Sequence, residues 1–220
     1  RLRANPVPVT YRDGSTGEEI TETITADHVA GLVRMYAYMP AVGALLPQLI
    51  HEASQGRYAN LMALAKMMQS DMAESMSMGM QMSVICTEDA GSMVVRAEDA
   101  DTVLGNRMVE GMAAMCEVWP KGDKPADFNT PLKSDLPVLI LTGEFDPVTP
   151  PKYGEEIAKG LPNARWLDLK GQGHNVIGVG CMPKLFAQFI EKADAKALDA
   201  KCLDTLAYAP PFTSYNGWEP

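Results

Sequence analysis

The sequence lacks the long apolar run that a membrane span would need. Hydrophobic residues make up 46% of its 220 positions, yet no segment approaches the roughly 20 consecutive apolar residues that cross a bilayer. The opening stretch "RLRANPVPVTY" also has no apolar run like that of a signal peptide. The apolar residues are therefore available for a core, and the length suits one large domain or two small ones.

Positive charge is scarce as well. Asp and Glu number 28 against 19 for Lys and Arg, which gives a net charge of -9 and a pI near 4.8. The basic residues are scattered along the chain, so they form no patch for neutralising phosphates. We expect no nucleic-acid partner.

The four cysteines lack the spacing of a metal site or a redox motif. None lies in a C-x-x-C pair, which argues against a thiolate zinc site and against a thioredoxin-like motif. The even number permits two disulfides, and four reduced thiols in a cytoplasmic protein fit the count equally well. We expect no bound metal and no cofactor.

Hydrophobic periodicity divides the chain into two regions, and residues 1–130 form the first. Alternating residues on both sides of a turn at Asp13–Gly17 predict a β-hairpin. Apolar residues at three- and four-residue steps predict helices from Ala26 to about Met80 and from about Glu98 to Val118, with the short apolar segment "MSVIC" between them. The polar stretch "KGDKPADFNTPLKSD" is the best candidate for a linker.

Methionine is concentrated in this first region, where the segment from Met62 to Met82 holds eight of the 15. Thioethers can bind Cu(I). The helical spacing of Met62, Met68, Met72 and Met76 instead favours a soft, adaptable surface.

Residues 131–220 follow a strand, helix, strand, helix order. The corresponding stretches are "LPVLILTG", "PKYGEEIAKGL", "ARWLDLKG" and "CMPKLFAQFIEKA". The first is fully apolar, as is typical of a parallel strand buried on both faces. The alternation predicts an α/β layer with right-handed crossovers. Two strands do not make a stable covered sheet, so we expect its other strands to come from elsewhere.

An acid and a histidine follow these two strands. Asp146 lies beyond the first strand in "TGEFDPVTPP", and His174 lies beyond the second in "GQGHN". Because functional residues of open α/β sheets lie at the carboxyl ends of strands, we expect the two side chains to share a hydrogen bond. Such a pair is the acid and base of a nucleophilic triad, and α/β-hydrolases place Asp before His. Taken singly, Asp146 could simply bond turn amides, and His174 could be structural.

These motifs resemble those of an α/β-hydrolase family that contains secreted tripeptidyl aminopeptidases and relatives of proline iminopeptidase. The C-terminal segment of that family is similar to "PVLILTGEFDPVTPP", "GQGHNVIGVGCMPKLFAQFI" and "LDAKCL", and its lid region is similar to "RLRANPVPVTYRDGSTGEE", "LPQLIHEASQGRYANLMALA" and "MSVICTEDA". The resemblance implies an α/β chain that forms the C-terminal part of the α/β-hydrolase fold, with a mostly helical lid. The sequence departs from the family's Gly-His-Gly motif, because Asn175 follows His174.

The resemblance also implies roles for particular residues. The family's catalytic acid maps to Asp146 and its catalytic base to His174. Two disulfides are implied, and they would favour a secreted or periplasmic protein. These bridges pair Cys181 with Cys202 and Cys86 with Cys116.

The sequence contains no nucleophile elbow of the form G-x-S-x-G. The nearest matches are "DGSTG", which has Asp13 in place of the first glycine, and "EASQG", which has Glu52 there. In the family the serine precedes the lid, so we expect it upstream of Arg1. The expected partner is therefore the N-terminal part of the same hydrolase, and the isolated chain is expected to be inactive.

The function that we expect is that of a serine exopeptidase that releases residues from peptide N-termini through an acyl-enzyme. Such an enzyme binds a protonated α-amine, and Glu88 and Asp89 are the candidate carboxylates. They could equally be a solvated pair or acids at a helix N-terminus. An esterase or other acyl hydrolase would use the same triad. A non-catalytic lid or binding module with Asp146 and His174 as relics is the alternative from another class.

Overall fold

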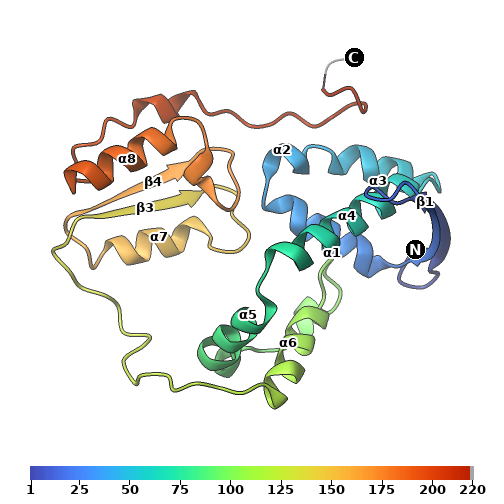
Figure 1. Cartoon of the computed structure of the whole chain (residues 1–220), viewed down its shortest axis with the longest axis horizontal. Coiled ribbons are helices and arrows are strands. Elements are labelled where there is room, and N and C mark those ends of the chain that lie inside the picture. Colours follow the sequence, from blue (N-terminus) through green and yellow to red (C-terminus); the bar gives the residue numbers. More distant parts are fainter. Residues whose placement is uncertain (219–220) are drawn as a thin grey trace. The chain divides into compact units, whose positions relative to one another are not determined.

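The computed structural model of the chain describes residues 1–218, apart from the side chains of residues 71–73 and 75. It contains two compact units (Figure 1). Unit 1 consists of Arg1–Leu32 and Glu52–Asn129, and unit 2 consists of Val33–His51 and the chain from Thr130 onward. One break between the units lies between Asn129 and Thr130. The segment Val33–His51 clusters with the C-terminal part of the chain.

Unit 1 begins with the β-hairpin that the alternating pattern predicted. Strand β1 (Val7–Arg12) pairs in antiparallel fashion with β2 (Glu19–Ile24). The carboxylate of Asp13 accepts hydrogen bonds from the turn N–H groups of Ser15 and Thr16 at 2.9 and 2.8 Å. An aspartate that bonds its own turn in this way stabilises the reversal of the chain.

Helices form the rest of unit 1. Helix α4 packs against strand β1, and the side chains of Ile24, Leu61 and Met62 are fully or almost fully buried. The side chain of Met72, one of the helically spaced methionines, lies outside the described residues. The helices that lie in or enter this unit are α1 (Ala26–Ala37), α3 (Leu46–Ser54), α4 (Ala59–Ser75), α5 (Met78–Val84) and α6 (Arg107–Val118).

The apolar segment "MSVIC" is helical, because α5 continues directly into a turn of π-helix at Ile85–Asp89. One predicted boundary in unit 1 was wrong, because helix α6 begins at Arg107 and not near Glu98. A short 3-10 helix at Ala97–Asp99 precedes it, followed by a turn in which Gly105 has a φ of 58°. That backbone conformation suits glycine and interrupts the helix.

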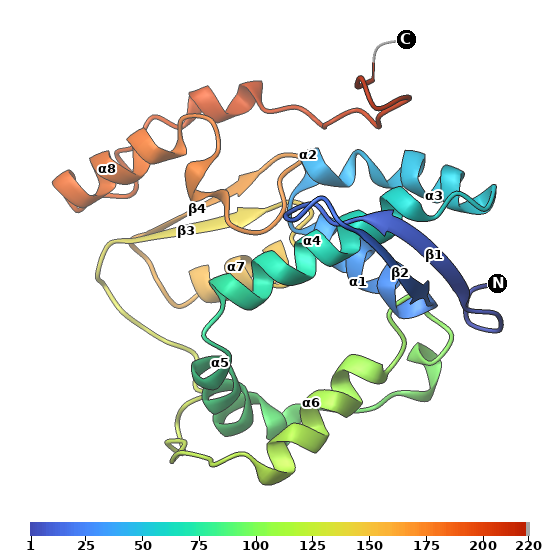
Figure 2. The ribbon, with the colours of Figure 1, turned by 45° about the vertical axis from the view of Figure 1, so that its right-hand side comes forward.

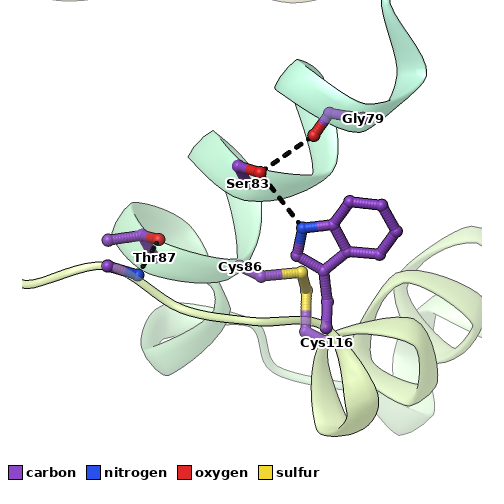
Figure 3. Close-up of a disulfide and its surroundings, with 7 residues drawn as sticks. Gly79, Ser83, Cys86, Thr87 and Cys116 are labelled. Carbon is purple, nitrogen blue, oxygen red and sulfur yellow. Dashed lines mark hydrogen bonds between the residues drawn. A yellow bond between two sulfur atoms is a disulfide. The ribbon is translucent and has the colours of Figure 1, made fainter.

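A disulfide joins Cys86 in the π-helix to Cys116 in α6 (Figure 3). Beside it, the indole N–H of Trp119 donates to the Ser83 hydroxyl at 3.1 Å. That hydroxyl in turn donates to the carbonyl of Gly79 at 3.0 Å. Both cysteines are buried in a small apolar cluster with Met82. The bridge therefore holds two helical segments together where little other core is available.

Unit 2 contains the predicted strand and helix pairs. Strands β3 (Val138–Gly143) and β4 (Ala164–Leu169) are parallel. Helix α7 (Pro151–Ala158) connects them, and α8 (Met182–Lys192) follows β4. The two helices lie on opposite sides of the strand pair (Figures 1 and 2). The expectation that β3 is buried on both faces is not met within this chain, because its first four residues are only half-buried.

The core of unit 2 lies between β4 and α8. Its buried residues are Leu169, Val176, Met182, Leu185 and Leu198. The second disulfide, Cys181–Cys202, borders this cluster. No helix within residues 1–218 is long and apolar enough to cross a membrane.

The segment Val33–His51 contributes the end of α1, the short helix α2 (Pro40–Gly43) and most of α3 to unit 2. Main-chain hydrogen bonds connect it to the rest of the unit. The N–H of His174 donates to the carbonyl of Tyr38, and the N–H of Phe212 donates to that of Ala44, both at 2.9 Å. These bonds explain why the segment groups with unit 2.

Candidate active site

The loops that follow β3 and β4 are joined along their main chains. The N–H of Glu144 donates to the carbonyl of Leu169 at 3.1 Å. The N–H of Phe145 donates to the carbonyl of Gln172 at 2.8 Å. These bonds continue the parallel pairing beyond the strand ends. They bring the Asp146 loop and the His174 loop together at one edge of the sheet, as expected for the carboxyl ends of parallel strands.

Two glycines permit this close approach. A Cβ atom on Gly143 would lie 2.0 Å from the carbonyl oxygen of Gly173, and a Cβ on Gly173 would lie 2.3 Å from that of Tyr38. Both distances are far inside van der Waals contact, and the obstructing atoms are backbone. Only glycine fits at either position without a shift of the loops.

Asp146 is buried and accepts four hydrogen bonds. Its Oδ1 accepts from the main-chain N–H groups of Val148 and Thr149 at 2.8 and 2.9 Å. Its Oδ2 accepts from the hydroxyl of Thr149 at 2.8 Å and lies 2.9 Å from Nδ1 of His174. The side chain of Asp146 is only 4% exposed. The local turn and the histidine together therefore hold both carboxylate oxygens in place.

The hydrogen bonds keep Asp146 ionised in spite of its burial. Burial is the largest single influence and raises the pKa of this carboxyl. The combined bonds from Thr149, His174 and Val148 outweigh burial, so the pKa of Asp146 lies below its usual value. A carboxylate in this state can orient an imidazole and stabilise its cation.

The main chain of His174 is held by a hydrogen bond, and its imidazole is partly exposed to solvent. Besides the main-chain bond to Tyr38, the ring of that tyrosine meets the imidazole edge-on, with centroids 5.4 Å apart. The histidine side chain is 37% exposed. Because an ionised Asp146 can only accept, Nδ1 carries the proton and Nε2 carries the free lone pair. Within the described residues Nε2 has no hydrogen-bond partner, so it can take a proton from a neighbouring nucleophile.

Asn175, where the resemblance to the hydrolase family implies a glycine, has a φ of 65°. This left-handed conformation is the one that glycine adopts freely. Asparagine is among the residues that tolerate it best. The departure from Gly-His-Gly is therefore compatible with the loop that carries His174.

The two carboxylates expected to bind an amine lie in unit 1. Glu88 and Asp89 end the π-helix, where Glu88 is half-buried and Asp89 is exposed. Lys124 donates to the main-chain carbonyl of Glu88 at 2.6 Å. Neither carboxylate has an ion-pair partner within the part of the chain that the structure describes. Asp146 and His174 belong to unit 2.

Sequence reasoning missed two contributors to the geometry of this site. Thr149 bonds Asp146 through both its N–H and its hydroxyl, a pattern that an Asp followed by Pro-Val-Thr makes recognisable as an Asx turn. Tyr38 acts on His174 through a main-chain carbonyl. No pattern in the sequence signals that contact.

Two parallel strands, the crossover helix α7 between them and an Asp–His pair at their carboxyl ends are features of the α/β-hydrolase arrangement. The family model of the TAP-like proteins matches residues 101–202, and this match supports an α/β-hydrolase of the TAP-like kind. The matched range includes Asp146, His174 and the Cys181–Cys202 bridge. The resemblance is confirmed over these residues. No curated protein matches the chain in the corresponding sequence comparison.

Proposed function

We propose that Asp146 and His174 are the acid and base of a serine exopeptidase that releases residues from peptide N-termini. The observation that carries this proposal is the hydrogen bond between Asp146 Oδ2 and His174 Nδ1. It leaves Nε2 as the nitrogen for proton transfer. The match to the TAP-like family supports a hydrolase.

In the proposed mechanism a serine hydroxyl loses its proton to Nε2 of His174 as it attacks the substrate carbonyl. The imidazolium then donates that proton to the leaving amine, and an acyl-enzyme remains. Water, deprotonated by His174, hydrolyses the acyl-enzyme. Asp146 keeps the imidazole in the productive tautomer and stabilises its positive charge throughout.

We propose that the serine comes from another segment of polypeptide, which together with residues 1–220 makes up the complete protein. Two observations support this. No G-x-S-x-G occurs in the sequence, and the apolar side chains at the start of β3 are only half-buried, as they would be if further strands extended the sheet.

Unit 1 is proposed to serve as a lid that binds the substrate's free amine through Glu88 or Asp89. A carboxylate with no ion-pair partner among the described residues suits a protonated amine, because charge-assisted hydrogen bonds are strong. The two disulfides support a secreted or periplasmic location, since such bonds persist in oxidising compartments.

Substrate profiling of the complete protein tests this function. Tripeptidyl and aminoacyl chromogenic amides should be hydrolysed, and N-acetylated versions of the same amides should react far more slowly. Residues 1–220 alone should give no turnover. Hydrolysis of esters without hydrolysis of peptides would favour an esterase, and no turnover of either class would favour a non-catalytic module.

A further inference from the structure

Three segments of unit 2 meet at the side chain of Glu144. Its Oε2 accepts a hydrogen bond from the main-chain N–H of Gly171 at 2.8 Å. Its Oε1 accepts a hydrogen bond from the hydroxyl of Tyr208 at 3.1 Å. The first bond crosses to the loop that carries His174, and the second reaches the segment that follows the Cys181–Cys202 bridge. One carboxylate therefore connects the two catalytic loops and the C-terminal part of the chain.

The tyrosine is fitted closely against both loops. Its ring stacks on Phe145, with centroids 5.5 Å apart and planes inclined by 20°, and the ammonium group of Lys170 lies 5.0 Å from its centre. Gly171 has a φ of 68°, and a Cβ there would lie 3.0 Å from the ring. The ring consequently packs on bare backbone, which fixes the direction of the Tyr208 hydroxyl toward Glu144.

We propose that Glu144 is a positioning residue for the Asp146–His174 pair, and that Tyr208 holds its carboxylate in place. Glu144 precedes Asp146 by two residues, and its partner Gly171 precedes His174 by three. A bond between these points limits how far the loops can separate, and so sets the approach of Oδ2 to Nδ1. This inference rests on the proposed function for its kinetic consequence only, because the hydrogen bond between Asp146 and His174 can be observed without turnover.

Three variants separate this role from a general contribution to stability. Glu144→Ala removes both hydrogen bonds. Glu144→Gln can keep both, since its amide oxygen can accept from Gly171 and its amide group can donate to the Tyr208 oxygen. Tyr208→Phe removes one bond and leaves the ring in place. Glu155→Gln, an exposed position on α7, is the matched control.

The experiment measures kcat, KM and the proton NMR signal of His174 Nδ1–H in the complete protein. A hydrogen bond to a carboxylate moves that signal far downfield, and a stability effect alone would not move it in folded protein. Glu144→Ala should shift the signal upfield or broaden it, and should lower kcat about tenfold with KM changed less than about twofold. Tyr208→Phe should have a smaller effect of the same kind. Glu144→Gln and Glu155→Gln should resemble the parent protein.

An unchanged Nδ1–H signal in both Glu144→Ala and Tyr208→Phe would overturn the inference, as would an equal loss in Glu144→Gln and Glu144→Ala. If Glu144→Ala does not fold, Tyr208→Phe against Glu144→Gln decides the question. A complete protein that hydrolyses nothing, but whose Nδ1–H signal shifts in these variants, would contradict the proposed function and retain the positioning role.

Discussion

The two units of this chain are stabilised in different ways. Unit 2 positions the Asp146 and His174 loops by backbone contact, with Gly143 and Gly173 allowing approaches that no other residue would permit. Unit 1 has a hairpin packed on α4 and a disulfide between the π-helix and α6. Both units expose large apolar side chains, but most of the exposed methionines among the described side chains lie in unit 1, where Met80 is 68% exposed.

Unit 2 therefore holds its atoms in a fixed geometry, whereas the surface of unit 1 is adaptable. Acid–base chemistry requires atoms to be held within a fraction of an ångström, and unit 2 provides that through a buried, fully bonded carboxylate. Flexible thioether side chains can adjust to ligands of different shape. Unit 1 is therefore suited to the substrate-binding role proposed for it, and the following experiments test the contrast.

The largest effect is expected at the proposed catalytic pair, Asp146 and His174. In the complete protein, His174→Ala should lower kcat by about 10⁴-fold or more, because the proton acceptor is lost. Asp146→Asn should cost on the order of 10⁴-fold, because an amide favours the wrong tautomer. Asp135→Asn, at an exposed position, is the control. Steady-state kinetics measure these losses, and a decrease below tenfold for either variant would contradict the assigned roles.

The disulfides should differ in importance between the units. The bridges span 30 and 21 residues, for which loop-closure entropy predicts similar contributions of roughly 3–4 kcal/mol. The Cys86–Cys116 bridge lies in a cluster of three buried residues, and Cys181–Cys202 borders one of five. Replacing Cys86 and Cys116 by serine should therefore reduce hydrogen-exchange protection in α5 and α6 more than the corresponding change reduces it in α8.

Exchange measurements on the parent protein and both double variants test this difference. Equal losses of protection in the two variants would show that the larger cluster gives unit 2 no additional support.

The two closely approached glycines, Gly143 and Gly173, should tolerate no side chain. Gly143→Ala would force Cβ against a fixed carbonyl, so we expect a loss of about 2–3 kcal/mol in the free energy of unfolding, together with reduced kcat. Gly178→Ala is the control, because a Cβ there meets nothing within 4 Å. Denaturant titration measures both. If Gly143→Ala and Gly178→Ala unfold at the same denaturant concentration, the contact between the loops is not rigid.

A smaller effect is expected from the amine-binding proposal for unit 1. Glu88→Gln should raise KM for free-amine peptides by about tenfold, as expected for the loss of one charge-assisted hydrogen bond, and should leave acyl esters unaffected. Asp89→Gln tests the neighbouring candidate in the same assay. Equal losses on peptides and esters would refute amine recognition by Glu88.

The smallest effect concerns acid stability. Because the pKa of Asp146 is lowered in the folded protein, its ionised form adds stability that is fully present above its unfolded value near 3.8. That stability is lost as the pH falls through the folded pKa. The difference in unfolding free energy between the parent protein and Asp146→Asn should therefore shrink as the pH falls from about 5 toward 3. A difference that stays constant down to pH 3 would contradict the lowered pKa.

The sequence predicted unit 2 better than unit 1, for physical reasons. Short apolar runs, prolines at helix starts and the strand-end position of Asp146 and His174 are local signals, and they led to the correct strands, helices and hydrogen bond. The five residues of "MSVIC" are too few to distinguish a buried strand from a helix. Their helical conformation follows from continuation of α5 and from packing around Cys86.

Contacts made by the backbone, or between distant residues, could not be predicted. Tyr38 and Ala44 join unit 2 through main-chain carbonyls, which every residue possesses. Glu144 lies in a polar turn, where the sequence shows no periodic pattern. Its hydrogen-bond partners lie 27 and 64 residues further along the chain. Such contacts are consequences of the tertiary fold.

Labelling of the complete protein with a fluorophosphonate tests the central claim most directly, because this reagent phosphonylates only an activated serine. The account predicts one modified serine, located by peptide mass spectrometry outside residues 1–220, and labelling slowed at least about 100-fold by His174→Ala. A modified serine within residues 1–220, or labelling that His174→Ala leaves unchanged, would contradict it.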